Sequence, residues 1–175
     1  VDGAEIAVGG HPTGVTFHPS GQWAYVTNRL DDTVSVVDTS QRHVVSTVPV
    51  GDEPHGVCTD AAGKQLFVVN TSTDDISVLD AQSLQEVKRL EASRSPWSLA
   101  LSPDGQRLLV TNSLPRFVPF RTPPLAELTL INAEAAVVER RLVIPGANLL
   151  MGVCWHPSGE FALCTINRTN NLVPM

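Results

Sequence analysis

Two histidines lie near the start of successive apolar segments, and their side chains are the first in the chain that suggest chemistry. His11 precedes Pro12-Thr13-Gly14-Val15, and His55 follows Pro54 in a similar segment. Imidazole is the commonest metal ligand among protein side chains. We assign both histidines to the same position of a repeated unit, so they are the candidate metal ligands. The alternative is that each imidazole packs and forms hydrogen bonds at a loop corner.

Arginines gather in segments that we assign to loops on one face. Five of the twelve Lys and Arg residues belong to this group, in a chain whose net charge is −6. They are Arg29, Arg94, Arg116, Arg121 and Arg168. Because the guanidinium group matches carboxylate and phosphate geometry, they predict contact with an anionic ligand or partner. The alternative is that these arginines are only solvated.

Aromatic residues accompany the arginines. Trp97 follows Pro96 at the start of an apolar segment, where it either stacks on a ligand or caps the core. Phe117 and Phe120 lie in the segment 113–124, which also holds four prolines. This composition argues against both a strand and a solvated linker, so we predict an insertion that contacts the ligand or partner.

Other polar residues fit turns better than catalysis. His18 and His156 each open a His-Pro-Ser-Gly turn, and Asp32 and Asp74 recur in equivalent polar breaks. Side chains of this kind commonly satisfy backbone groups in turns. No Ser-His-Asp order, paired acid set or phosphate loop stands out, so we predict no catalytic residue. For this chain alone we expect a binding protein rather than an enzyme.

The elements that position these residues repeat every 42 residues. Tyr25-Val26-Thr27-Asn28 recurs as Phe67-Val68-Val69-Asn70 and again as Val110-Thr111-Asn112. Glycines at positions 21, 63 and 105 and prolines at 12, 54 and 96 keep the same step. A sustained period near 40 indicates one supersecondary unit stacked on copies of itself.

One repeat contains four short β-strand signals and no helix signal. In the first repeat they are the segments 15–17, 23–27, 33–37 and 44–48, each bounded by turn residues. Four strands per unit with this period predict an all-β fold, a β-propeller of four-stranded antiparallel blades.

The repeats resemble the YVTN family of bacterial β-propeller repeats. The matching elements are Pro12-Thr13-Gly14-Val15, Ser102-Pro103-Asp104-Gly105, Tyr25-Val26-Thr27-Asn28 and Thr33-Val34-Ser35-Val36-Val37-Asp38. The resemblance implies a bacterial protein of the periplasm or the cell surface. It implies little about activity, because a propeller is a scaffold for unrelated functions.

The phase of the repeat predicts about four blades of a partial ring. Residues 1–10 provide the outer strand of a neighbouring blade, and blades follow at 11–52, 53–94 and 95–148, the last with the insertion 113–124. Residues 149–175 form an incomplete fourth blade. We therefore interpret the chain as part of a larger propeller, or as one of two chains that associate to complete one ring.

Composition excludes two classes of partner. The net charge of −6 argues against nucleic acid, whose binding depends on basic residues. No apolar run is long enough to span a membrane. The three cysteines are expected to be buried free thiols, with Cys154 opposite Phe161 rather than Cys164.

These observations leave three functional hypotheses. We favour a binding or interaction propeller that presents its loop face to a partner protein or a small anion. The second is the propeller part of a redox protein associated with cytochrome c. Its haem would belong to a separate domain, because this sequence has no Cys-x-x-Cys-His motif and predicts no cofactor of its own. The third is a lactonase-like hydrolase with the same architecture.

Overall fold

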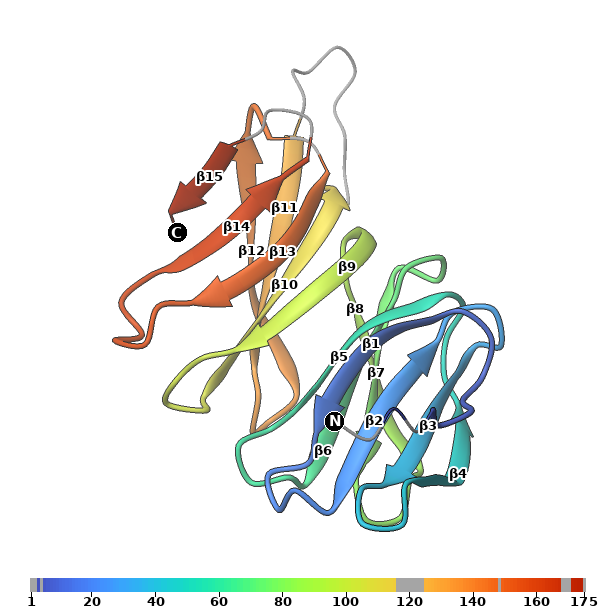
Figure 1. The fold of residues 1–175 in the computed structure, drawn as a ribbon. Helices are drawn as coiled ribbons and strands as arrows, with labels where there is room; N and C mark the ends of the chain where they lie inside the picture. Colours follow the sequence, from blue (N-terminus) through green and yellow to red (C-terminus); the bar gives the residue numbers. More distant parts are fainter. Residues whose placement is uncertain (1–2, 4, 116–124, 148, 168–170, 175) are drawn as a thin grey trace.

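The chain folds into antiparallel β-sheets that follow one another along the sequence (Figure 1). The computed structural model describes residues 3, 5–115, 125–147, 149–167 and 171–174. Within these residues every regular element is a β-strand, as the sequence predicted. The same residues contain no helix with the length and apolar character needed to cross a membrane.

We call the sheets blades 1 to 4. Blades 1 to 3 each have four strands in sequential order, and blade 4 has three in the described residues. Blade 1 consists of β1 (Pro12–Phe17), β2 (Trp23–Asn28), β3 (Thr33–Asp38) and β4 (His43–Pro49). Blade 2 consists of β5 (Pro54–Thr59), β6 (Gln65–Asn70), β7 (Asp75–Asp80) and β8 (Glu86–Glu91). Blade 3 consists of β9 (Arg94–Leu101), β10 (Arg107–Leu114), β11 (Leu125–Asn132) and β12 (Val137–Pro145), and blade 4 of β13 (Leu150–Trp155), β14 (Ala162–Ile166) and β15 (Asn171–Pro174).

Glycine closes the turn between the first two strands of each blade. Gly21, Gly63, Gly105 and Gly159 all have a positive φ, between 69° and 75°. In the first of these turns the N–H of Gly21 donates to the carbonyl of His18 at 2.8 Å. Only glycine adopts this backbone conformation without steric cost, which explains why it recurs with the repeat.

The core consists of three apolar layers, each lying between neighbouring blades. Tyr25 of blade 1 packs in one layer with Leu66 of blade 2, and Phe67 of blade 2 packs in the next with Leu108 of blade 3. A third layer joins blades 3 and 4. Because successive residues of a strand point to opposite faces, Leu66 and Phe67 serve different layers although they are adjacent. Each blade therefore depends on its neighbours for burial.

Threonines tie each blade to the innermost strand of the next. The hydroxyl of Thr27 donates to the carbonyl of His55 at 2.7 Å, and that of Thr111 donates to the carbonyl of Met151 at 2.8 Å. The equivalent position of blade 2 is Val69, which cannot donate. There the hydroxyl of Thr71 donates instead to the carbonyl of Pro96, at 2.8 Å.

The asparagine that ends the recurring motif is a structural residue. Asn112 is fully buried, and its amide donates to the carbonyl of Glu127 and the hydroxyl of Thr129, each at 3.0 Å. Its carbonyl accepts from the N–H of Ser93, which precedes β9, at 3.2 Å. Asn28 makes the equivalent contacts in blade 1. The motif thus fixes the links into blades 1 and 3, whereas Asn70 Oδ1 of blade 2 is buried without a hydrogen-bond partner among the described residues.

Two further expectations from the sequence concern the insertion and the cysteines. The predicted insertion begins at the end of β10 and ends before β11, and its residues 116–124 lie outside the described part of the chain. Cys154 is exposed and lies opposite Leu163, so its predicted burial and its pairing with Phe161 are both wrong. The turn is centred one residue later than expected, because Gly159 takes the positive φ.

Replacing Asn112 with alanine tests the role of the motif in stability. The Asn112→Ala variant leaves the N–H of Ser93 and the hydroxyl of Thr129 without their buried partner. We expect its free energy of unfolding in urea to fall by about 3 kcal/mol. The matched change Asn167→Ala removes an exposed amide and should leave the free energy of unfolding almost unchanged. Equal losses in the two variants would contradict the assignment.

Candidate functional site

The four innermost strands, β1, β5, β9 and β13, lie side by side and line a pocket of about 370 Å³. Each contributes the residue at the same repeat position to the pocket lining. These residues are Thr13, His55, Trp97 and Met151. We call the pocket the channel pocket, because innermost strands surround the central channel of a propeller.

Small residues next to these positions let the innermost strands approach one another. A Cβ atom on Gly14 would collide with the backbone carbonyl of His55. A Cβ atom on Gly56 would lie 3.0 Å from the carbonyl of Trp97. The side chains of His55 and Trp97 are therefore brought together by close backbone packing.

His55 and Trp97 form an aromatic pair at the channel pocket. Their ring centroids are 3.7 Å apart and the ring planes are inclined by 32°. Burial lowers the pKa of His55 below its usual value, and the positive charges of Arg29 and His11 lower it further, whereas Glu53 acts in the opposite direction. The imidazole is therefore neutral at pH 7.

An ion pair lies beside this aromatic pair. Arg29 Nη2 donates to Glu53 Oε1 at 2.9 Å, and the hydroxyl of Ser72 donates to Glu53 Oε2 at 2.9 Å. These hydrogen bonds, that of Ser72 first, lower the pKa of Glu53. Arg29 Nε is buried and has no hydrogen-bond partner among the described residues.

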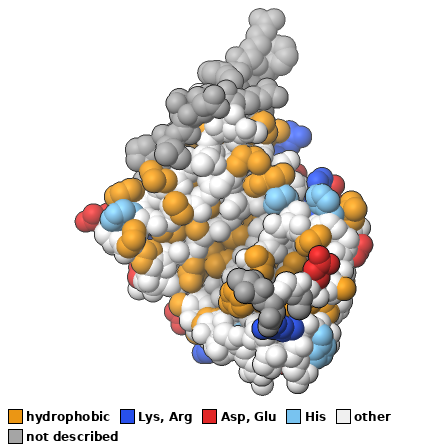
Figure 2. All heavy atoms as spheres, viewed as in Figure 1, with side chains coloured by type: hydrophobic (Ala, Val, Ile, Leu, Met, Phe, Trp, Pro, Cys, Tyr) orange, Lys and Arg blue, Asp and Glu red, His pale blue; other side chains and the backbone are white. Residues whose placement is uncertain are grey.

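We call His11, Arg29, Glu53, His55 and Trp97 together the channel mouth. Figure 2 shows histidine side chains close to acidic and basic ones on the face that carries the innermost strands. The cluster combines a flat aromatic surface, a neutral imidazole and a guanidinium group that is paired with one carboxylate and whose Nε has no hydrogen-bond partner among the described residues. Such a combination suits a small ligand with both an anionic group and an apolar or planar part.

The backbone around the channel mouth is set by strained links between blades. His11, Glu53 and Leu149 directly precede innermost strands and Ser95 is the second residue of β9, and all four have φ between 50° and 55°. The side chain of Asp32 accepts from the N–H of Glu53 at 2.9 Å, and Asp74 accepts from that of Ser95 at 2.7 Å. The side chains of the recurring aspartates therefore bind links between blades, 21 residues further along the chain, whereas the sequence predicted hydrogen bonds within the turn.

The repeat position assigned to the two histidines is wrong. The residue equivalent to His11 is Glu53, because both precede the proline that starts the innermost strand. His55 follows that proline, and its equivalent in blade 1 is Thr13. The two imidazoles still lie near one another, since His11 acts on the pKa of His55. No three His, Cys, Asp or Glu residues come together as metal ligands in the part of the chain that the structure describes.

The remaining predicted residues are dispersed or lie outside the described residues. Arg94 starts β9 and lines a separate pocket of about 450 Å³, next to Arg89 and Asp75. The other five predicted ligand or partner residues lie outside the part of the chain whose placement is described. They are Arg116, Phe117, Phe120, Arg121 and Arg168.

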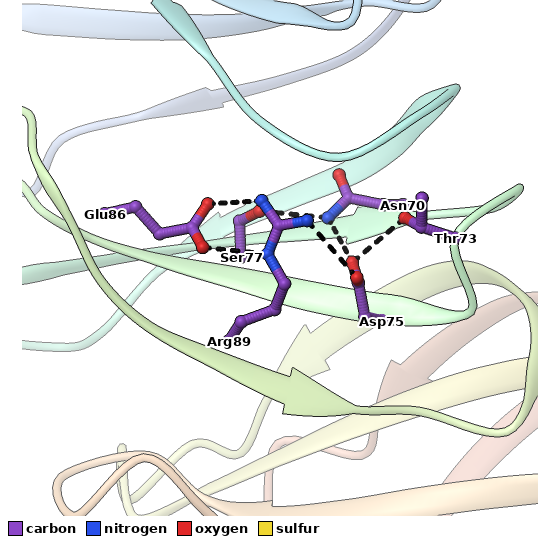
Figure 3. Close-up of polar contacts among 6 residues, drawn as sticks. All are labelled: Asn70, Thr73, Asp75, Ser77, Glu86 and Arg89. Carbon is purple, nitrogen blue, oxygen red and sulfur yellow. Dashed lines mark hydrogen bonds and ion pairs between the residues drawn. The ribbon is translucent and has the colours of Figure 1, made fainter.

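Arg89 belongs to a polar cluster that the sequence did not reveal (Figure 3). It donates to both carboxylate oxygens of Glu86, at 2.8 and 2.6 Å, and its Nη1 lies 3.4 Å from Asp75 Oδ2. Asp75 also accepts from the amide of Asn70 at 2.7 Å. These partners raise the pKa of Arg89 and neutralise its charge. We therefore interpret this cluster as structural. The channel mouth remains the candidate functional site.

The structure defines the chain as part of a β-propeller, and comparisons with known proteins give its family. Residues 5–122 match the family described as Lactonase, 7-bladed beta-propeller, so the chain belongs to this family. No curated protein matches the chain.

Solved structures with similar folds have low sequence identity to the chain. A protein of Bacteroides uniformis ATCC 8492 assigned as a 6-phosphogluconolactonase is 16% identical, with a TM-score of 0.76, over 94% of this chain and 50% of that one. Dihydro-heme d1 dehydrogenase NirN in complex with DHE is 18% identical, with a TM-score of 0.72, over 97% and 36%. Kuenenia stuttgartiensis hydrazine synthase is 19% identical, with a TM-score of 0.58, over 95% and 58%. The chain thus spans between about a third and three fifths of these proteins, and the likeness concerns the fold alone.

The low pKa of His55 predicts that stability decreases in mild acid. The unfolded chain binds a proton at this histidine near pH 6.5, whereas the folded chain binds it only at lower pH. The free energy of unfolding should therefore fall as pH decreases below about 6.5. The His55→Gln variant should show a shallower fall in urea titrations between pH 8 and pH 5. An unchanged slope would contradict the prediction, and the change His43→Gln at an exposed histidine is the control.

Proposed function

We propose that this protein binds a small organic anion at the channel mouth. The observation that carries the proposal is the position of the His55–Trp97 aromatic pair beside Arg29 on the channel pocket. The ligand's carboxylate or phosphate accepts hydrogen bonds from Arg29, and its apolar part contacts Trp97. The sequence analysis favoured a binding protein for a partner protein or a small anion. The proposal keeps the binding function and restricts the ligand to a small anion.

The electrostatics of His55 support an anionic rather than a cationic ligand. Two of the three charged groups that shift its pKa are positive, Arg29 and His11. An anion placed between them offsets the repulsion that protonated His55 experiences. Ligand binding and protonation of His55 are therefore linked, and the anion should bind more tightly as pH decreases from 7 to 5.5.

Gluconate, a small polyhydroxy carboxylate, is a suitable probe for this linkage. We expect saturating gluconate to raise the pKa of His55, measured from the NMR shift of its imidazole ring across a pH titration. The Arg29→Gln variant should weaken binding about tenfold, because a charge-assisted hydrogen bond is lost. The matched change Arg140→Gln, at an exposed arginine of β12, should not weaken it.

Two outcomes would contradict the proposal. The first is a pKa of His55 that does not respond to gluconate, phosphate or citrate. The second is binding that survives Arg29→Gln but is lost when Arg116 and Arg121 are changed to glutamine together. That result would move the site to the insertion and would restore the partner-binding hypothesis for residues 113–124.

Lactone hydrolysis is the second candidate, and the family membership together with the neutral imidazole favours it. In this reaction His55 accepts a proton from water as the water oxygen attacks the lactone carbonyl. The ring C–O bond then breaks, and its oxygen takes up the proton to give the hydroxy acid. Assistance by a general base typically contributes a hundredfold or more to the rate.

A pH-stat assay with glucono-δ-lactone tests this second candidate. We expect the wild-type protein to accelerate hydrolysis above the spontaneous rate, and His55→Gln to reduce the catalysed rate by about a hundredfold. Trp97→Phe retains a flat aromatic ring and should retain most of the rate. If wild type and His55→Gln both match the rate in buffer alone, the protein is not a hydrolase of this substrate. Binding of gluconate is tested independently by the NMR titration of His55.

The haem-associated alternative lacks a specific observation in this chain. Two proteins of similar fold are a dihydro-heme d1 dehydrogenase and a hydrazine synthase, but the likeness is one of fold. The 175 residues contain no Cys-x-x-Cys-His motif, so a haem would be carried by another domain or protein. We retain location in the periplasm or at the cell surface as part of the proposal, from the resemblance of the repeats.

A further inference from the structure

The guanidinium group of Arg29 already binds a carboxylate of the protein itself. Its Nη2 donates to Glu53 Oε1 at 2.9 Å, and this contact crosses from blade 1 to the link that leads into blade 2. The remaining N–H groups of the guanidinium have no hydrogen-bond partner among the described residues. An incoming anion therefore has donors available on Arg29 but must share them with a fixed negative charge.

Contacts on both its side chain and its backbone hold Glu53 in this position. The hydroxyl of Ser72 donates to Glu53 Oε2 at 2.9 Å, and the N–H of Glu53 donates to Asp32 Oδ1 at 2.9 Å. The hydrogen bonds from Ser72 and Arg29 lower the pKa of Glu53, so its carboxylate is ionised at pH 7. Two carboxylates, those of Glu53 and Asp32, therefore lie together at the channel mouth.

The fold does not require a carboxylate at this position of the repeat. His11, Ser95 and Leu149 occupy the equivalent positions with φ between 52° and 55°, so the link accepts side chains of very different chemistry. The ion pair also adds little to stability, because the side chains of Arg29 and Glu53 are 34% and 38% exposed and water weakens such pairs. The charge of Glu53 is thus free to serve recognition of a ligand.

The charges at the channel mouth favour a ligand with one anionic group over a ligand with two. A single carboxylate gains hydrogen bonds from Arg29 and meets the repulsion of Glu53 once. A second anionic group on the same ligand adds a further repulsion from Glu53 and Asp32. For two unit charges about 7 Å apart near a protein surface, this repulsion amounts to about a fivefold loss of affinity at physiological ionic strength.

We infer that Glu53 determines the charge selectivity of the channel mouth and restricts its ligands to monoanions. This inference rests on the anion site proposed above and narrows the ligand to a small monocarboxylate. Glu53 shares Arg29 with that carboxylate and repels any further anionic group. Its removal therefore strengthens the binding of every small anion, and strengthens the binding of dianions most.

Gluconate and glucarate are matched probes for this inference, because they share one polyhydroxy carbon chain and differ by one carboxylate. Calorimetry and the NMR shift of the His55 ring, both at pH 7, give their dissociation constants. The wild-type protein should bind gluconate more tightly than glucarate. Glu53→Gln preserves the size of the side chain and should tighten gluconate about fivefold and glucarate about 25-fold, since one and two repulsions are removed.

Two further variants control for other effects of the substitution. Glu86→Gln removes a carboxylate from the second Arg–Glu pair of blade 2, on the outer strand β8, and should leave both dissociation constants unchanged. Glu53→Ser introduces the residue that blade 3 has at the equivalent position, Ser95. It should change the preference between the probes in the same direction as Glu53→Gln, and it provides the measurement if the glutamine variant does not fold.

The possible outcomes separate this inference from the proposed function. If gluconate binds the wild-type protein but Glu53→Gln tightens neither probe, the ion pair only joins two blades, so this inference fails while the anion site stands. Equal tightening of the two probes also overturns the inference, because Glu53 then does not select by charge. If neither probe binds the wild-type protein or Glu53→Gln, the anion site and the inference both fail.

Discussion

The burial of apolar side chains between neighbouring sheets is the interaction on which the whole structure depends. Each blade has two apolar faces, because adjacent residues such as Leu66 and Phe67 point in opposite directions. Burial of one such side chain contributes about 2 kcal/mol, and only a neighbouring sheet provides it. The blades are therefore stable as a stack and have little stability as separate units.

Polar contacts determine how the stacked blades meet at the channel. Thr27 and Thr111 bind carbonyls of the next innermost strand, and buried Asn28 and Asn112 bind the links that lead into blades 1 and 3. These hydrogen bonds satisfy backbone groups that would otherwise be buried without partners. Asp32 and Asp74 bind the links that lead to His55 and Trp97, through the N–H groups of Glu53 and Ser95. The recurring motif thus has a structural role, and it helps to position the residues that are able to bind a ligand.

The sequence predicted the four-stranded unit and the glycine turns, and the structure confirms both of them. It was less successful at the site. Arg29, Trp97, His11 and His55 were singled out, but Arg94 lies at a separate pocket. The histidines were assigned to one repeat position although they are two positions out of step. Neighbouring blades bring together residues about 40 positions apart, and inspection of one repeat does not reveal such pairs.

The kind of unit and its order can be predicted from the sequence, because strand alternation, turn glycines and the 42-residue period are local properties of the chain. Which unlike residues at equivalent positions share a surface depends on the packing of the blades. Thr13, His55, Trp97 and Met151 line one pocket because the innermost strands lie side by side. Their contacts cross between blades, where distance depends on how the sheets pack rather than on separation along the sequence.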